Sequence, residues 1–456
     1  MKIYRTLIMF SVFTFLFFNS SGQSGLVNLL DLAGSSYPGI AARMSKADAL
    51  KEQVSLEKNT LLPALDVAWQ ANYATFNNIT GMSYPGMIMP ISGPPVSENQ
   101  YDAVPGSAAA LVLKWSPLTF GQRAAMIDHS RHLYEKQMSE VDIESLRVKY
   151  LVASLYLDMS AFKELTEVYR KNISRTEFSL KQIGMLVQSG IRPAVDSLQL
   201  KGDLARARSE LYQVENQLQR LKLELQELLA GSIPGEDEGG EFFYTHLPIL
   251  PFKQIPAGEA ENPVLLSARK ELESHKSILR QVSLSWTPRI DFWGSTNARG
   301  SGVGADGSID KRGGWSFSRY NYGLGVQVAF PVFELANHRM KTRYQEALVR
   351  SSESQLEQTV LSLDRNENVA FGELSTALKV AGEVPMEHEY NEMAYQAIQQ
   401  RYVSGLTDYS VFIKAQYDLL HSETKLRIAY MDAWKSLLKL AYVKGNMDIF
   451  LNQIRN

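Results

Sequence analysis

Two histidines are the residues of this 456-residue chain with the clearest potential to bind a metal ion. His129 and His132 lie three positions apart in a segment that is expected to be helical, and this spacing places two imidazoles on one helix face. A zinc site needs at least a third protein ligand, and none is evident in the sequence. We therefore interpret the pair as surface histidines and predict that the protein holds no metal and no cofactor.

A glycine pattern in the second half of the chain has the spacing of a dinucleotide-binding loop. Gly302, Gly304 and Gly307 spell GxGxxG. That loop binds a pyrophosphate only where it joins a strand to the N-terminus of a helix. No apolar helical pattern follows these glycines, and they fall in an expected loop. The pattern therefore does not indicate nucleotide binding.

Other reactive side chains are few. The thioethers of Met82, Met87 and Met89 could bind Cu(I), but apolar residues at a loop tip that touches lipid account for them better. Glu387 and Glu389 read as the solvated start of a helix. The chain has no cysteine, which excludes thiol catalysis, thiolate metal sites and disulfides. Because no nucleophile–base group stands out, we predict that the protein is not an enzyme.

The N-terminus has the parts of a secretory signal peptide. Lys2 and Arg5 precede an apolar run from Leu7 to Phe18, and small polar residues follow. We predict a signal peptide over residues 1–22. No other stretch approaches about 18 apolar residues, so any contact of the mature protein with a membrane would require strands. The net charge of −2 gives no indication of a nucleic-acid partner.

Alternating apolar and polar residues predict four strands. The segment from Tyr320 to Phe330 is the clearest, with aromatic and aliphatic residues on one face and small or polar residues on the other. Strands of about ten residues joined by long polar loops are typical of a transmembrane β-barrel, although each strand alone also fits a soluble sheet. The strands are expected at about residues 64–76, 104–116, 288–298 and 315–330.

Four strands cannot close a barrel, and an open sheet cannot lie in lipid with unpaired edges. The loops over residues 77–107 and 294–319 are rich in Gly, Pro, Ser and Asn, as the outer loops of such barrels are. Three chains contributing four strands each would supply a barrel of twelve. The strand pattern thus points to an assembly.

Long helices alternate with the strands in a repeat of about 215 residues. Apolar residues from Leu204 to Leu228 keep the 3,4 spacing of a coiled coil, and the proline-free segment from about Gly121 to Ser189 is the expected partner. In the second repeat, Gly382 and Pro385 are expected to break or bend the first helix. The predicted organisation is a first repeat at 23–230 with a helical hairpin at about 120–230, a linker at 231–260, a second repeat at 261–445 with a hairpin at about 333–445, and a C-terminal tail at 446–456.

The strand ends and hairpin turns together resemble the TolC family of trimeric outer-membrane efflux ducts. The resemblance is carried by Ser116-Pro117-Leu118, Phe330-Pro331-Val332, the turn at Gly190, and Arg401 to Leu406 followed by Ala415-Gln416. It implies a mixed α and β fold with long coiled-coil α-helical hairpins plus four transmembrane β-strands per chain, in a homotrimer with a 12-strand β-barrel and a 12-helix periplasmic α-barrel.

The same resemblance implies a function and a location. The protein would be a passive channel in the cell outer membrane, with its helical part in the periplasm, and would serve as the exit duct of a tripartite efflux or type I export system. Its partners would be a periplasmic adaptor (membrane fusion) protein, an inner-membrane pump and outer-membrane lipid, with no nucleic acid. The alternative is a secreted, soluble coiled-coil scaffold or interaction protein, which the coiled-coil seams alone would allow.

The resemblance also assigns roles near the turns at Gly190 and Gly405. The family often places acidic residues six and nine positions after the second turn glycine, but here Val411 and Lys414 stand there, so an acidic ring does not carry over. Asp408 is the nearest carboxylate and is a candidate substitute.

Family members close this end with links from a Tyr and an Arg near the second glycine to an Asp in the first turn. Tyr402 and Asp196 occupy two of those positions, whereas Thr407 replaces the Arg. We therefore expect a Tyr402–Asp196 hydrogen bond in a lock that is weaker than usual. The alternative is that Tyr402 only packs between helices.

Overall fold

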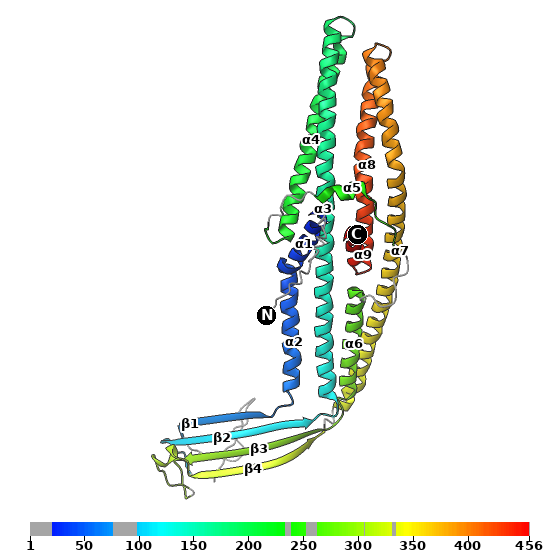
Figure 1. Cartoon of the computed structure of the whole chain (residues 1–456). Coiled ribbons are helices and arrows are strands. Elements are labelled where there is room, and N and C mark those ends of the chain that lie inside the picture. The colour runs from blue at the N-terminus through cyan, green and yellow to red at the C-terminus, as the bar shows by residue number, and fades with distance from the viewer. Residues whose placement is uncertain are drawn as a thin grey trace, which may run out of the picture. The chain divides into compact units, whose positions relative to one another are not determined.

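The computed structural model describes residues 21–75, 98–232, 239–251, 262–304, 306–330 and 334–455. Most of the predicted signal peptide and the cluster of Met82, Met87 and Met89 lie outside these ranges. The chain packs as two compact units (Figure 1). The helical unit draws on residues 1–46, 137–268 and 356–456, and the sheet unit on residues 47–136 and 269–355. Each unit takes segments from both sequence repeats, so the repeats interlock rather than form separate domains.

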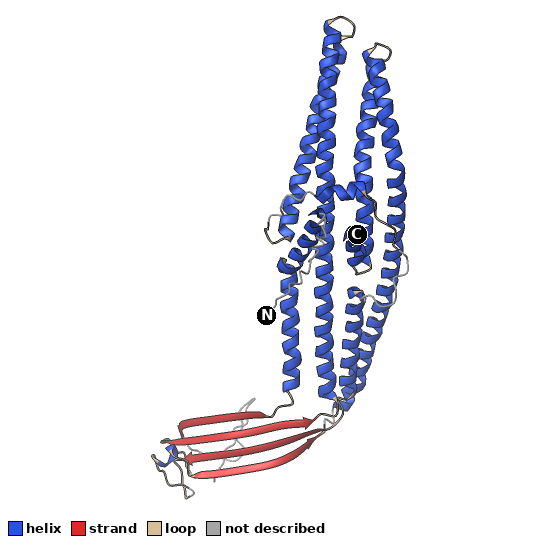
Figure 2. Ribbon diagram, in the orientation of Figure 1, coloured by secondary structure: helices blue, strands red, loops and turns tan. Residues whose placement is uncertain are grey.

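The sheet unit contains the four predicted strands as one antiparallel sheet (Figure 2). Their order in the sheet is their order in the chain, and Ala64 pairs with Lys114, Val112 with Ser295 and Arg289 with Ala329. The last strand begins four residues later than predicted, because Gly313–Trp315 form a short 3₁₀ turn. The strands are β1 (Ala64–Thr75), β2 (Ala103–Leu118), β3 (Arg289–Ser301) and β4 (Arg319–Ala329).

The apolar rows of the two edge strands are exposed in the single chain. On β4, Tyr322 is 88% exposed and Leu324 is 84% exposed, and Val67 and Trp69 on β1 are similarly open. A row of large apolar side chains of this kind is unfavourable in water and is favourable against lipid or a partner. Within the described residues, the sheet therefore has two edges without a further strand and an apolar face that is left exposed.

Two long hairpins make up most of the helical unit. In the first, α3 (Gln122–Gln188) returns as α4 (Ala194–Leu228), and the ion pair Arg208–Glu177 joins them at 2.7 Å. In the second, α7 (Glu334–Val403) returns as α8 (Tyr409–Val443), and Lys425–Glu387 joins them at 2.6 Å. The first parts of α3 and α7 belong to the sheet unit. The other helices are α1 (Ser21–Ser36), α2 (Pro38–Asn59), α5 (Phe242–Thr245), α6 (Pro263–Ser283) and α9 (Asp448–Arg455). None of the helices in the described ranges is long and apolar enough to span a membrane.

Of the two outcomes predicted near Gly382 and Pro385, a break or a bend, the break does not occur. Helix α7 continues through Pro385 without interruption. Ala381 and Val384 are buried against Ala429 of α8 on the other side of the hairpin. This packing holds the helix in register on both sides of the proline, so that the loss of one backbone hydrogen bond does not end it.

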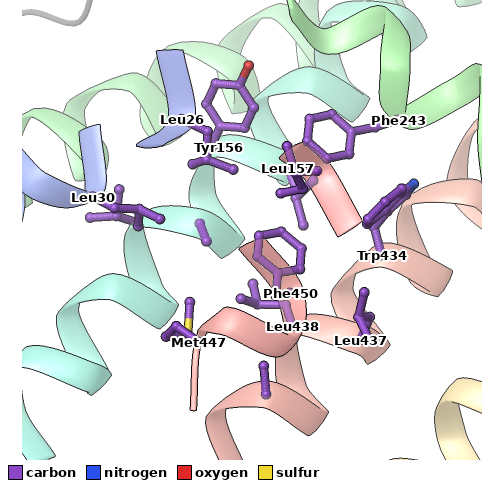
Figure 3. Packing of buried hydrophobic residues seen from close by; sticks show 14 of the residues in the cluster. Leu26, Leu30, Tyr156, Leu157, Phe243, Trp434, Leu437, Leu438, Met447 and Phe450 are labelled. Atoms are coloured by element: carbon purple, nitrogen blue, oxygen red, sulfur yellow. The ribbon is translucent and has the colours of Figure 1, made fainter. Parts of the chain in front are cut away.

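The core of the helical unit gathers around Trp434 (Figure 3). Its indole meets Phe243 of α5 edge-on at 5.3 Å and Phe450 of α9 at 6.1 Å between ring centroids. Helix α1 adds the buried residues Leu26 and Leu30. The predicted linker and the predicted C-terminal tail each contain a short helix that supplies a fully buried phenylalanine to this core.

Candidate functional site at the hairpin turns

The two hairpin turns share one backbone geometry. Gly190 and Gly405 have φ of +73° and +79°, which only glycine adopts without strain. Ile191 N donates to Leu186 O at 2.9 Å, and Leu406 N donates to Arg401 O at 2.8 Å, as in the Schellman helix ending. The turns lie at the same end of the helical unit (Figure 1). The repeat in the sequence thus becomes two equivalent turns that contact each other.

Tyr402 of α7 and Asp196 of α4 link the two hairpins. The Tyr402 hydroxyl donates to Asp196 Oδ2 at 2.8 Å, so the expected hydrogen bond is present in the structure. The residues are 1% and 7% exposed, and the Tyr402 ring stacks on Phe412 at 4.8 Å between centroids. Burial, with the hydrogen bond to Asp196 as the next cause, raises the pKa of Tyr402 above its ordinary value. Tyr402 therefore stays a protonated donor at neutral pH and also packs between the helices.

Arg192 is a third member of this contact and was not predicted. Its guanidinium lies over the Tyr402 ring, 4.2 Å from the centroid. Its Nη2 donates to the backbone oxygen of Tyr402 and, at 2.9 Å, to that of Thr407. Arg192 stands two residues after Gly190, and Thr407 stands two residues after Gly405. Thr407 stands where the family places an arginine, and Arg192 occupies the equivalent position of the first turn. We name Arg192, Asp196 and Tyr402 the tip clasp.

Replacing Arg192 with lysine is expected to loosen the tip clasp. Lysine keeps the charge but lacks the planar fork that bonds two carbonyls while stacking on a ring. Loss of hydrogen bonds to a charged donor should cost about 1.5–3 kcal/mol in local stability. Hydrogen–deuterium exchange of the backbone amides at 402–408 should then quicken by at least about tenfold. Arg401→Lys, at an exposed neighbouring position, is the matched control, and equal exchange in both variants would contradict the role of Arg192.

The remaining predicted site residues lie at the surface of the turns. Asp408 is the residue before α8, and its side chain makes no capping hydrogen bond. Val411 is about half exposed and Lys414 is exposed, on the first turns of α8. None of the three joins the tip clasp. Their effect on entry to a channel remains a proposal.

The histidine and glycine motifs do not form the sites that their spacing allows. His129 Nδ1 lies 2.8 Å from Ser274 Oγ, and His132 Nδ1 lies 3.2 Å from Ser277 Oγ. Both imidazoles are half-buried against α6, which corrects their interpretation as surface histidines, and burial lowers the pKa of His129. No group of three metal-ligating side chains occurs in the described part of the chain. Gly302 and Gly304 follow β3 in a loop closed by a Val303–Ile309 bridge, not in a strand–helix turn.

Solved structures of outer-membrane proteins have this fold. A membrane protein from Pseudomonas aeruginosa is 18% identical, with a TM-score of 0.76 over 93% of this chain and 90% of that one. The outer membrane protein VceC from Vibrio cholerae is 13% identical, with a TM-score of 0.73 over 93% and 96% of the two chains. The open state of the MtrE outer membrane channel from Neisseria gonorrhoeae is 15% identical, with a TM-score of 0.73 over 92% and 89%. A comparison with curated protein sequences gave no match.

The family comparison covers most of the chain. The profile of the outer membrane efflux protein family matches residues 29–231 and 256–441, which include all four strands and nearly all of both hairpins. This match decides against a secreted, soluble scaffold, and it agrees with the resemblance found in the sequence. The chain belongs to the outer membrane efflux protein family.

Proposed function

We propose that three copies of this chain form the passive exit duct of a tripartite efflux or type I export system. The protein lies in the outer membrane with its helical part in the periplasm, as its family implies. The observation that carries the proposal is the four-stranded sheet with two unpaired edges and exposed apolar rows. Unpaired edges are not tolerated in lipid, so β1 of one copy would pair with β4 of the next until three copies close a barrel.

The energy for transport would come from an inner-membrane pump, so the duct itself requires no catalytic group. The pump and its periplasmic adaptor would dock at the hairpin turns, where Gly190, Gly405 and Asp408 are exposed. Docking would part the two hairpins and release the tip clasp. With Val411 and Lys414 near the entrance, the entrance would attract cations less strongly than one lined with carboxylates.

The assembly is tested by the detergent-corrected mass of protein extracted from outer-membrane fractions. A mass near three chains is expected, because four strands per chain cannot close a barrel alone. A monomer that stays in solution without detergent would overturn the proposal.

The gate is tested with Tyr402→Phe, which keeps the ring stacked on Phe412 and removes only the hydroxyl. Asp196 then loses its phenol donor while it remains buried, at a cost of about 1.5–3 kcal/mol to the closed state. The leak conductance of the reconstituted protein in planar bilayers should rise about tenfold or more. Tyr390→Phe, at an exposed tyrosine of the same helix, should leave it unchanged. If the leak conductance of Tyr402→Phe equals that of the wild type, Tyr402 only packs between the helices.

A further inference from the structure

A second contact between the hairpins lies two helical turns further along α4, at Asp203. The Tyr409 hydroxyl donates to Asp203 Oδ2 at 2.5 Å, and the Tyr417 hydroxyl donates to Asp203 Oδ1 at 3.1 Å. Both tyrosines belong to α8, whereas Asp203 belongs to the other hairpin. Both oxygens of one carboxylate are thus held by phenols from across the contact.

The position of Asp203 on its helix makes this contact a counterpart of the tip clasp. Asp196 and Asp203 are seven residues apart and so lie on the same face of α4, about 10 Å apart along its axis. Leu200 lies between them and is fully buried in the cluster that contains Phe412 and Leu419. The face of α4 toward the second hairpin therefore presents an acid, an apolar residue and a second acid.

The electrostatics of this contact favour donation by the phenols. The Asp203 side chain is only 15% exposed, and its charge is compensated by the two phenol donors and by Arg206 Nη1, which lies 3.7 Å from Oδ1. Arg206 Nη1 donates to the Tyr417 hydroxyl at 2.7 Å, which polarises that hydroxyl toward Asp203. Burial, followed by the bond to Asp203, raises the pKa of Tyr409. Removing the two tyrosine hydroxyls would take one hydrogen-bond donor from each oxygen of this mostly buried carboxylate.

We propose that Asp203, Tyr409 and Tyr417 form a second lock, which holds the hairpins together independently of the Tyr402–Asp196 bond. The proposal rests on the proposed function of the turns as a gate. The second lock makes two phenol–carboxylate bonds, whereas the Tyr402–Asp196 bond is one, so the loss of both Asp203 bonds should weaken the closed state at least as much as the loss of the Tyr402 hydroxyl. Both contacts stabilise the same closed state, so the loss of either one raises the open population, and a docking partner must release both to open the turns fully.

The test compares open probabilities in planar bilayers for three variants of the full-length protein: Tyr402→Phe, the double variant Tyr409→Phe/Tyr417→Phe, and the triple variant. Every variant keeps its rings, including the Tyr402–Tyr409 contact at 6.1 Å, and loses only hydroxyls. The double variant should raise the open probability at least about tenfold, and the triple variant should show roughly the product of the two effects. Tyr212→Phe/Tyr390→Phe, at exposed tyrosines of α4 and α7, is the matched control.

Asp203→Asn provides a second measurement that leaves the phenols in place. An amide oxygen can still accept from one phenol but without the charge, so the open probability should fall between those of wild type and the double variant. The second lock is overturned if the double variant and Asp203→Asn match the control while Tyr402→Phe opens the channel, and the proposed gate then stands. If Tyr402→Phe also matches the control, both the second lock and the gating role of the turns fail. The detergent-corrected mass tests the duct separately.

Discussion

Replacing Trp434 with alanine is expected to lower the free energy of unfolding by about 3–5 kcal/mol, the range for a large aromatic residue removed from a core. Trp434 is fully buried, and its ring contacts Phe243 and Phe450. Its Nε1 also donates to the backbone oxygen of His246 at 2.9 Å. Trp434 of α8 therefore contacts both the segment between the repeats and the C-terminal helix, and its removal would weaken the packing of both.

Denaturant unfolding of the detergent-solubilised protein, followed by helical circular dichroism at a fixed protein concentration, measures this cost. Trp434→Phe retains a ring but loses the indole donor, so it should cost clearly less than the alanine variant. Trp315→Ala, at an exposed position of the sheet unit, should change stability by no more than about 0.5 kcal/mol. Equal costs for the two alanine variants would show that the core does not depend on Trp434.

The sequence predicted those features whose cause is local. Period-two alternation identified the strands, because a sheet with one apolar face requires it. Gly190 and Gly405 identified the turns, because a left-handed backbone favours glycine. Tyr402 and Asp196 were found by comparison with a family, and the structure places them within hydrogen-bond distance.

Features that depend on contacts between distant segments were missed. Arg192 donates hydrogen bonds to backbone oxygens that are more than 200 positions away in the sequence. The only local indication of its role is its position two residues after the turn glycine. Gly382 and Pro385 were expected to break or bend α7, and packing across the hairpin keeps the helix unbroken against that local preference. Helices α5 and α9 are short and are stabilised by the core to which they contribute, so a scan for long periodic patterns does not find them.

The spacing relates Asp203 to Asp196, but its burial and its partners appear only in the structure. It lies one heptad beyond Asp196, and a carboxylate at that interval on a coiled-coil face needs donors on the partner helix. The predicted apolar seam began at Leu204 and so stopped just short of it. Extended toward the turn, the 3,4 spacing gives Leu200 and Ser197, so Asp196 and Asp203 each lie one position before a seam residue, at the polar flank where coiled-coil helices make specific contacts.

Replacing Glu423 with glutamine is expected to cost about 2–3 kcal/mol of stability, which is near the lower end for a buried ion pair broken on one side. Arg175 of α3 donates to both carboxylate oxygens of Glu423 in α8, at 2.8 and 2.6 Å. The side chains are 23% and 16% exposed, so water compensates little for a lost partner. Glutamine leaves the guanidinium charged with only one acceptor in place of two.

A double substitution distinguishes the net stabilisation by the ion pair from the destabilisation caused by a buried guanidinium without its partner. Arg175→Met/Glu423→Leu removes both charges and fills the space with apolar atoms, so its stability should return to within about 1–2 kcal/mol of wild type or exceed it. Glu373→Gln breaks the exposed Lys439–Glu373 pair at 2.6 Å between α7 and α8, and it should cost no more than about 0.5–1 kcal/mol. If Glu423→Gln costs no more than this control, the Arg175 pair behaves as a surface pair. The double variant contains no unpaired guanidinium. If it is nevertheless as unstable as Glu423→Gln, the lost stability comes from the Arg175–Glu423 ion pair itself.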